Sequence, residues 1–413
     1  MSKNFMSKFL SSGTDQSDQS SLNNRSNKDS KPPIYWTPTL VFIITFAIAV
    51  TAVPYYGFVH GYDWEIWVGF LVFLIFNGMS ITGGYHRLWS HNAYKAHPIL
   101  RWFFALFGAA ATQNSILVWA SGHRRHHRHV DDDEKDPYSA GRGLWFSHIG
   151  WMLRNYPSGA VDFSNVKDLQ RDKIVMFQHK HYLALVLGMN FGVPLIFGLI
   201  HGDIIGALLV IGVLRLVVSH HTTFFINSLA HFWGTQPYTD ENSARDNPVL
   251  AFFTYGEGYH NYHHIFQNDY RNGIRWYHWD PTKWLIAACS VVGLTSQLQR
   301  VSDFKIQRAI LSMQFQRANE KLKSAKNADH WRAHLEKEYQ QFLDSMSEWR
   351  QLQQEWVQSQ KDKIQSKKEE LFEKKDELFS KWNQAVLTTR FKELEYALKM
   401  QQKRLQVMAL QMA

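Results

Sequence analysis

The sequence is almost free of cysteine: Cys289 is the only one among 413 residues. A single cysteine excludes an intrachain disulfide, a zinc site with several cysteine ligands and a cysteine-bound iron–sulfur cluster. Histidine, in contrast, occurs 21 times. Any transition metal that this chain binds must therefore be held mainly by imidazole nitrogens.

Charge is also missing from long stretches of the chain. Leu40–Tyr56 contains no charged residue, and Trp64–Thr82 contains one acid. Leu183–Ile200 and Ile204–Phe225 are similarly apolar, apart from Arg215 in the last stretch. Because a membrane span needs roughly 20 mostly apolar residues, these stretches predict four spans in two pairs, with Arg215 facing the bundle interior. Buried core helices of a soluble protein are the alternative, which such long paired stretches disfavour.

The distribution of basic residues predicts the orientation in the membrane. Residues 1–35 contain five lysines and arginines, whereas the loop between the first two spans contains none. By the positive-inside rule, the short loops face outward. Both termini, residues 83–182 and residues 226–413 are then cytoplasmic. We expect a multi-pass integral membrane protein, with the bacterial inner membrane as its location.

Glycine and proline are absent from Lys305 to the end of the chain. Apolar residues recur there at steps of three and four or their multiples, and then at steps of seven, a pattern that favours long helices packed along a seam over a solvated single helix. The seam residues are Leu335, Tyr339, Phe342, Met346, Trp349, Trp356, Ile364, Leu371, Leu378 and Ala385. The sequence thus predicts an all-α protein. Residues 1–35 are expected to form a disordered tail, residues 36–300 a membrane domain with a cytosolic helical cap, and residues 301–413 a helical, coiled-coil extension capable of self-association.

The histidines gather in short motifs. The motifs are HRLWSH, HRRHH, NSLAH and HNYHH, and they contain His86, His91, His123, His126, His127, Asn227, His231, His260, His263 and His264. On a helix, positions i, i+3 and i+4 share a face, so each HxxHH motif directs three imidazoles into one volume. Nine imidazoles are too many for one metal and predict a dinuclear site. The other twelve histidines lack the pattern and are expected to be structural or solvated.

Four or five nitrogen ligands for each metal suit a redox pair that activates dioxygen. Imidazole suits zinc, copper, iron and nickel, and zinc has no redox chemistry. Iron is therefore the expected metal. Since zinc binds more tightly than ferrous iron to a given site, zinc could occupy the centre as an inactive surrogate. The chain offers no motif for a flavin, a haem or an iron–sulfur cluster, and nothing that suggests a nucleic-acid partner.

The motifs HRLWSH, HRRHH, NSLAH and GEGYHNYHH resemble the histidine boxes of the membrane fatty acid desaturases, most closely the stearoyl-CoA (delta-9 acyl-CoA) branch. The segments Asp136–Leu153 and Asp269–Ile286 also resemble that family, so the likeness extends over about residues 35–300. The resemblance implies four spans, a cytosolic cap, a centre of two iron ions and a kinked tunnel for the acyl chain.

The resemblance also implies roles for single residues. One metal would be bound by His86, His91, His123, His127 and His264. The other would be bound by His126, His231, His260 and His263, with Asn227 holding a water ligand. Gln113, Asn114 and Trp119 match positions at the chain entry and bend, as does Thr223, whereas Phe224 replaces a tryptophan of the animal enzymes. No catalytic side chain is expected beyond the metal ligands.

The expected reaction inserts a cis double bond, at the delta-9 position, into a saturated acyl chain, using dioxygen and two electrons. Acyl-CoA is the expected substrate, but Ser121-Gly122 replaces an Arg-Asp pair that binds the CoA head in the animal enzymes. Nearby basic residues such as Arg154 suit a phosphate-bearing head, so an acyl carrier protein or an acyl lipid remains an alternative carrier.

The electron donor must be a separate protein, because the chain lacks the HPGG haem-binding motif. A ferredoxin or a b-type cytochrome with its reductase would serve. Two other functions stay open: an acyl hydroxylase or oxygenase on the same histidine framework, and a membrane scaffold that acts through its C-terminal helices.

Overall fold

The computed structural model describes residues 31–323, 328–369 and 374–411, and these are overwhelmingly helical. The described strands are β1 (Lys95–Ala96) and β2 (Thr295–Ser296), which pair antiparallel with Lys95 opposite Ser296. The expected all-α class is confirmed. Most of residues 1–35, predicted as a disordered tail, lie outside the described residues, and the predicted domain limits remain predictions.

Four helical segments are long and apolar enough to cross a membrane, which confirms the predicted spans. They are Trp36–His60, Trp64–Ser90, Tyr182–His201 and Ile204–Phe232. Their elements are α2 (Trp36–Val50), α3 (Ala52–His60), α4 (Trp64–Met79), η1 (Ser80–Ser90), α9 (Tyr182–Leu187), η7 (Gly188–Gly192), α10 (Val193–His201), α11 (Ile204–Ala207), η8 (Leu208–Leu214), α12 (Arg215–Asn227) and α13 (Leu229–Phe232). The second and fourth segments run beyond the predicted ends and reach the histidine motifs.

The arginine in the fourth segment lies inside the helix bundle, as predicted. Arg215 is fully buried, and its guanidinium donates hydrogen bonds to the carbonyls of Ala110 (3.0 Å) and Ile211 (3.1 Å). It also donates to the side chain of Asn190. An intramembrane charge is stable only when its donors are paired in this way, so Arg215 ties the fourth segment to its neighbours.

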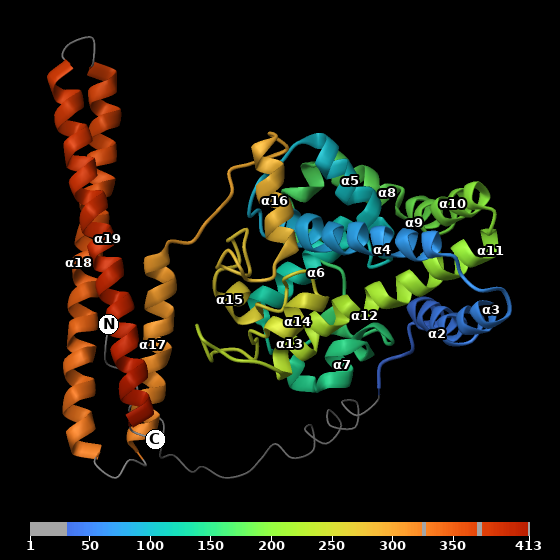
Figure 1. Cartoon of the computed structure of the whole chain (residues 1–413), viewed down its shortest axis with the longest axis horizontal. Helices are drawn as coiled ribbons and strands as arrows, with labels where there is room; N and C mark the ends of the chain where they lie inside the picture. The colour runs from blue at the N-terminus through green and yellow to red at the C-terminus, as the bar shows by residue number, and fades with distance from the viewer. Residues whose placement is uncertain (1–30, 324–327, 370–373, 412–413) are drawn as a thin grey trace, which may run out of the picture.

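The cap gathers at one end of α4 and α12, at the opposite end from α3, α10 and α11 (Figure 1). Its α-helices are α5 (Pro98–Ala109), α6 (Ile116–His129), α7 (Leu144–His148), α8 (Lys173–Lys180), α14 (Pro248–Phe253), α15 (His260–Ile265) and α16 (Pro281–Val291). Short 3-10 turns between α6 and α8 are η2 (Ala140–Arg142), η3 (Gly150–Met152), η4 (Pro157–Gly159), η5 (Phe163–Asn165) and η6 (Leu169–Arg171). A buried core that includes Tyr85, Phe104 and Ile286 joins η1, α5 and α16.

The C-terminal extension consists of α17 (Asp303–Leu322), α18 (Ala328–Glu369) and α19 (Lys374–Gln411). Leu335 and Phe342 of the predicted seam are buried with Leu394 and Leu398 of α19, while Tyr339 is 46% exposed. Packing of the long helices is thus confirmed, whereas a coiled-coil supercoil stays a prediction. Ala385 is exposed. The side chains of Ile364, Leu371 and Leu378 lie outside the described residues.

Candidate metal centre

The second span ends in a π-helix, and this explains how the two histidines of the HRLWSH motif come together. In a π-helix the backbone hydrogen bonds join i to i+5, and the amide of His91 donates to the carbonyl of His86 at 3.1 Å. The two imidazoles therefore point into the same volume, although their spacing looks too long for an α-helical pair. The sequence did not predict the π-helix, because such helices are rare and have no strong compositional signal.

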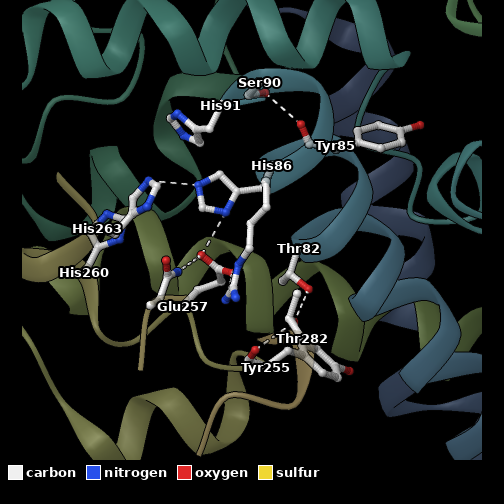
Figure 2. Close-up of polar contacts among 12 residues, drawn as sticks. Thr82, Tyr85, His86, Ser90, His91, Tyr255, Glu257, His260, His263 and Thr282 are labelled. Atoms are coloured by element: carbon white, nitrogen blue, oxygen red, sulfur yellow. Dashed lines mark hydrogen bonds and ion pairs between the residues drawn. The ribbon is translucent and has the colours of Figure 1, made fainter. Parts of the chain in front are cut away.

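Five imidazoles from three segments form the first group. They belong to His86, His91, His123, His127 and His263. The Nε2 atom of His263 lies 2.9 Å from Nε2 of His86 and 3.0 Å from Nε2 of His127, and His91 and His123 approach to 2.8 Å through the same atoms. Figure 2 shows His263 of α15 and His86 of η1 facing each other. The group thus ties the second span to α6 and α15.

Four imidazoles form the second group, which lies beside the first. They belong to His126, His231, His260 and His264. Their Nε2 atoms are separated by 3.3 Å between His126 and His264, by 3.1 Å between His264 and His260, and by 3.2 Å between His260 and His231. This group links α6, α13 and α15, so the fourth span also ends at the centre.

The expected division of ligands was wrong for two histidines. The resemblance assigned His264 to the first metal and His263 to the second, whereas the structure has them in the opposite groups. The reason is the helical geometry of α15: His260 and His264, at i and i+4, lie on one face, while His263 points to a neighbouring one. The predicted set of nine imidazoles is nevertheless brought together.

The spacing of the nitrogens fits two bound metal ions. Metal–nitrogen bonds of about 2.1 Å that meet at right angles separate their nitrogens by about 3 Å, which matches the distances in both groups. Burial lowers the pKa of His91, His123 and His127 well below the usual range, as it does in α15 for His260, His263 and His264. Burial thus favours the neutral form of these six imidazoles, the form that binds metal.

A buried carboxylate supports the first group from behind. Oε2 of Glu257 lies 2.9 Å from Nδ1 of His86, and Arg87 donates to Oε1 of Glu257 at 2.9 Å. Burial opposes ionisation of Glu257, but His86 and Arg87 outweigh it and lower its pKa. Arg87 also pairs with Asp280 at 3.0 Å. Such carboxylate–histidine contacts fix ring orientation and raise ligand basicity.

A different set of oxygens supports the second group. Nδ1 of His126 lies 2.9 Å from the carboxylate of Asp136, and Nδ1 of His231 lies 2.7 Å from Oγ of Ser243. Ser243 in turn donates to Asp131 at 2.6 Å. The sequence reasoning missed these partners and Glu257. The only available signal was an acidic residue close to the HRRHH and HNYHH motifs, which is too common to be specific.

The residues expected along the acyl chain are partly brought together. Nε2 of Gln113 donates to Oγ1 of Thr223 at 3.0 Å, and Trp119 stacks on His123 with ring centroids 4.8 Å apart. Phe224 is buried against Phe42. Asn114 has a positive φ of 72°, Asn227 lies at the end of α12, and Arg154 donates to the carbonyl of Pro32. The roles assigned to these residues and to Gln113, Trp119, Thr223 and Phe224 all remain predictions.

A basic cleft of about 270 Å³ lies on the surface of the cap. Arg125 and Arg128 of α6 and Lys135 line it together with the carboxylates of Glu134 and Asp162. Arg125 also donates to the carbonyl of Ser158 at 2.8 Å. Other arginines near the motifs are engaged elsewhere: Arg124 pairs with Asp168 at 2.7 Å, and Arg142 stacks over Phe146 at 3.7 Å. Of the arginines of α6, Arg125 and Arg128 are the two that line this surface cleft.

Comparison with known proteins assigns the class to which this centre belongs. Residues 62–293 match the fatty acid desaturase family, and the chain belongs to that family. It is 46% identical over 266 residues to the "Probable acyl-CoA desaturase" of Schizosaccharomyces pombe, covering 64% of this chain and 53% of that protein. It is 46% identical to "Acyl-CoA desaturase 1" of Saccharomyces cerevisiae, covering 59% and 48%.

An animal relative is matched over more of its own length. The "Delta(9)-fatty-acid desaturase fat-7" of Caenorhabditis elegans is 36% identical over 68% of this chain and 83% of that protein. The matched region spans about half the length of the two yeast relatives. Relatives from yeasts and animals overturn the expected bacterial inner membrane. Span length and loop charge could not reveal this, because both follow from properties common to bacterial and eukaryotic membranes.

Proposed function

We propose that the chain is a fatty acyl-CoA desaturase that inserts a cis double bond at the delta-9 position of a saturated acyl chain. The observation that carries the proposal is the convergence of nine buried imidazoles, in two groups, at the cap ends of the second and fourth spans. The names of the relatives support the substrate class and the double-bond position.

Two iron ions would be held by the two groups of imidazoles, with Asn227 holding a water ligand of the second ion. Bound iron would supply the redox chemistry by which dioxygen and two electrons remove two hydrogens from unactivated methylenes. The protein's part is to position the chain and to exclude water. Gln113, Thr223 and Trp119 are proposed to shape the bend of the chain beside His123, which supports selection of one bond.

The head group is proposed to bind at the basic cleft formed with Arg125 and Arg128. Two guanidinium groups and the ammonium of Lys135 suit the phosphates of CoA, because charged hydrogen bonds to phosphate are strong. Arg154, which donates to the carbonyl of Pro32, is proposed as a further contact of the head group. A separate acidic ferredoxin or cytochrome is proposed as the electron donor, with the centre and both termini on the cytoplasmic side.

Expression in a host that lacks its own desaturase tests this function. The expected result is monounsaturated fatty acid with its double bond at the delta-9 position, detected by fatty acid profiling, and none from a His123→Ala variant. Labelled acyl-CoA incubated with the purified protein and a reductase system then identifies the product. Alcohol as the sole product would instead indicate a hydroxylase, and unchanged unsaturation in His123→Ala would overturn the enzymatic function.

A further inference from the structure

Helix α19 carries an apolar face that packs against its own chain and a mixed apolar and charged face that is exposed. The inner face includes Leu387, Leu394, Leu398 and Leu405, all buried against α17 and α18. A second face is exposed along the same helix. It consists of Val386, Thr389, Glu393, Tyr396, Met400, Lys403, Val407 and Leu410, and we call it the outer seam.

The outer seam has the spacing of a helix-pairing surface. Its positions advance in strictly alternating steps of three and four residues, which is the heptad pattern of a coiled-coil seam. Tyr396 is 65% exposed, Val407 54% and Leu410 78%. Residues 386–410 span about 37 Å at 1.5 Å per residue. The exposed apolar side chains are thus aligned along one face of the helix, whereas surface hydrophobics without a partner are usually scattered singly.

The outer seam is complementary to itself when a second copy runs antiparallel. With the two-fold axis at the level of Leu398, residues that lie equally far before and after Leu398 face each other in the two copies. Val386 then faces Leu410 of the second copy, and Thr389 faces Val407. Tyr396 faces Met400. The two charged positions, Glu393 and Lys403, then face each other twice. A parallel arrangement would instead place Glu393 against Glu393.

We propose that two copies of this chain associate through the outer seams of antiparallel α19 helices. The charges within the seam favour this arrangement, because each Glu393 lies opposite Lys403 of the second copy. Charged flanking and seam positions set partner orientation in helix pairs. Like charges directly opposite one another would suppress the parallel alternative.

The orientation of the extension is compatible with two copies in one bilayer. Copies in the same membrane and with the same orientation are related by a two-fold axis parallel to the membrane normal. An antiparallel helix pair has its two-fold axis perpendicular to both helices. For this axis to be parallel to the membrane normal, α19 must run roughly perpendicular to the spans. Figure 1 shows α18 and α19 crossing the direction of α4.

Charge reversal in the full-length protein, reconstituted at known protein-to-lipid ratios, tests the proposal. Single-molecule photobleaching gives the oligomeric state. Glu393→Lys and Lys403→Glu each place like charges opposite one another at both sites and should raise the dimer dissociation constant at least about tenfold. The double variant should dimerise as the wild type does. A mixture of the two single variants should form heterodimers, because every opposing pair then has opposite charge.

The matched control is Lys337→Glu, an exposed charge reversal on α18, which should leave the dimer unchanged. Disulfide cross-linking checks the register: Thr389→Cys mixed with Val407→Cys should cross-link, whereas each alone should not. A wild-type protein that remains monomeric overturns the proposal. So does a dimer that neither single charge reversal weakens, because it would then form through another surface.

Discussion

The described residues contain two kinds of histidine cluster, and they differ in what lies around the rings. In the nine-histidine centre, Nε2 atoms converge while Glu257 and Asp136 approach the Nδ1 atoms of His86 and His126 from behind. His148 and His221 instead form a closed pair. Nε2 of His148 lies 3.0 Å from Nδ1 of His221, and its other nitrogen lies 2.9 Å from Oγ of Ser228.

The difference shows what distinguishes a metal centre from a structural pair. Both nitrogens of His148 are used by neighbouring protein groups, so neither is left to converge on a common point. Within the part of the chain that the structure describes, neither His148 nor His221 contacts a carboxylate. Convergent nitrogens supported by carboxylates are the arrangement that binds metal. Burial of imidazole alone is not sufficient.

Removal of a ligand should give the largest effect. His263→Ala deletes the imidazole whose Nε2 contacts both His86 and His127, so the first group loses the nitrogen that α15 supplies. Product formation should fall by at least about 100-fold, with roughly half of the bound iron lost, as measured by elemental analysis. His129→Ala, on α6 but outside both groups, is the control and should keep its metal. Full metal content in His263→Ala would remove His263 from the centre.

Neutralising the supporting carboxylates should have an intermediate effect. Glu257→Gln and Asp136→Asn preserve shape but remove the charge behind His86 and His126, so metal affinity should fall by about 10- to 100-fold. Titration with a competing chelator measures this. Because Glu257 supports the first group and Asp136 the second, each variant should weaken one metal. If each weakened both metals equally, the two groups would not be independent.

The sequence was sufficient where a feature depends on periodicity or composition. The spans follow from uninterrupted apolar stretches, and the set of nine converging imidazoles follows from helical spacing. The assignment of His263 and His264 to their groups could not be obtained in this way, because it depends on how α15 is rotated against α6 and α13. The joint placement of His86 and His91 required the π-helix, whose formation depends on tertiary packing.

The supporting residues were unpredictable for a related reason. Glu257 is recognisable only because it is buried between His86 and Arg87, and burial is a property of the assembled fold. The three-helix extension shows the same limit: the apolar repeat predicted packed long helices, but it did not distinguish the two faces of α19. Packing against α17 and α18 selects which of those faces is buried.

The smallest effect is expected at the closed pair, and it should depend on pH. Burial lowers the pKa of His148 to about 4, whereas an unfolded histidine has a pKa of about 6.5. As the pH falls below 6.5, the unfolded chain binds a proton that folded His148 does not, so folding stability is lost until the pH reaches about 4. His148 is about half-buried, so solvent screening reduces the effect.

In His148→Gln this contribution is absent, and its Tm should fall less on acidification than that of the wild type, by about 2 °C. Calorimetry of both proteins across this range, with His129→Gln as a matched control, measures the difference. Iron content at neutral pH should be unchanged in His148→Gln. Loss of iron there would mean that the closed pair supports the metal centre, and the contrast between the two clusters would fail.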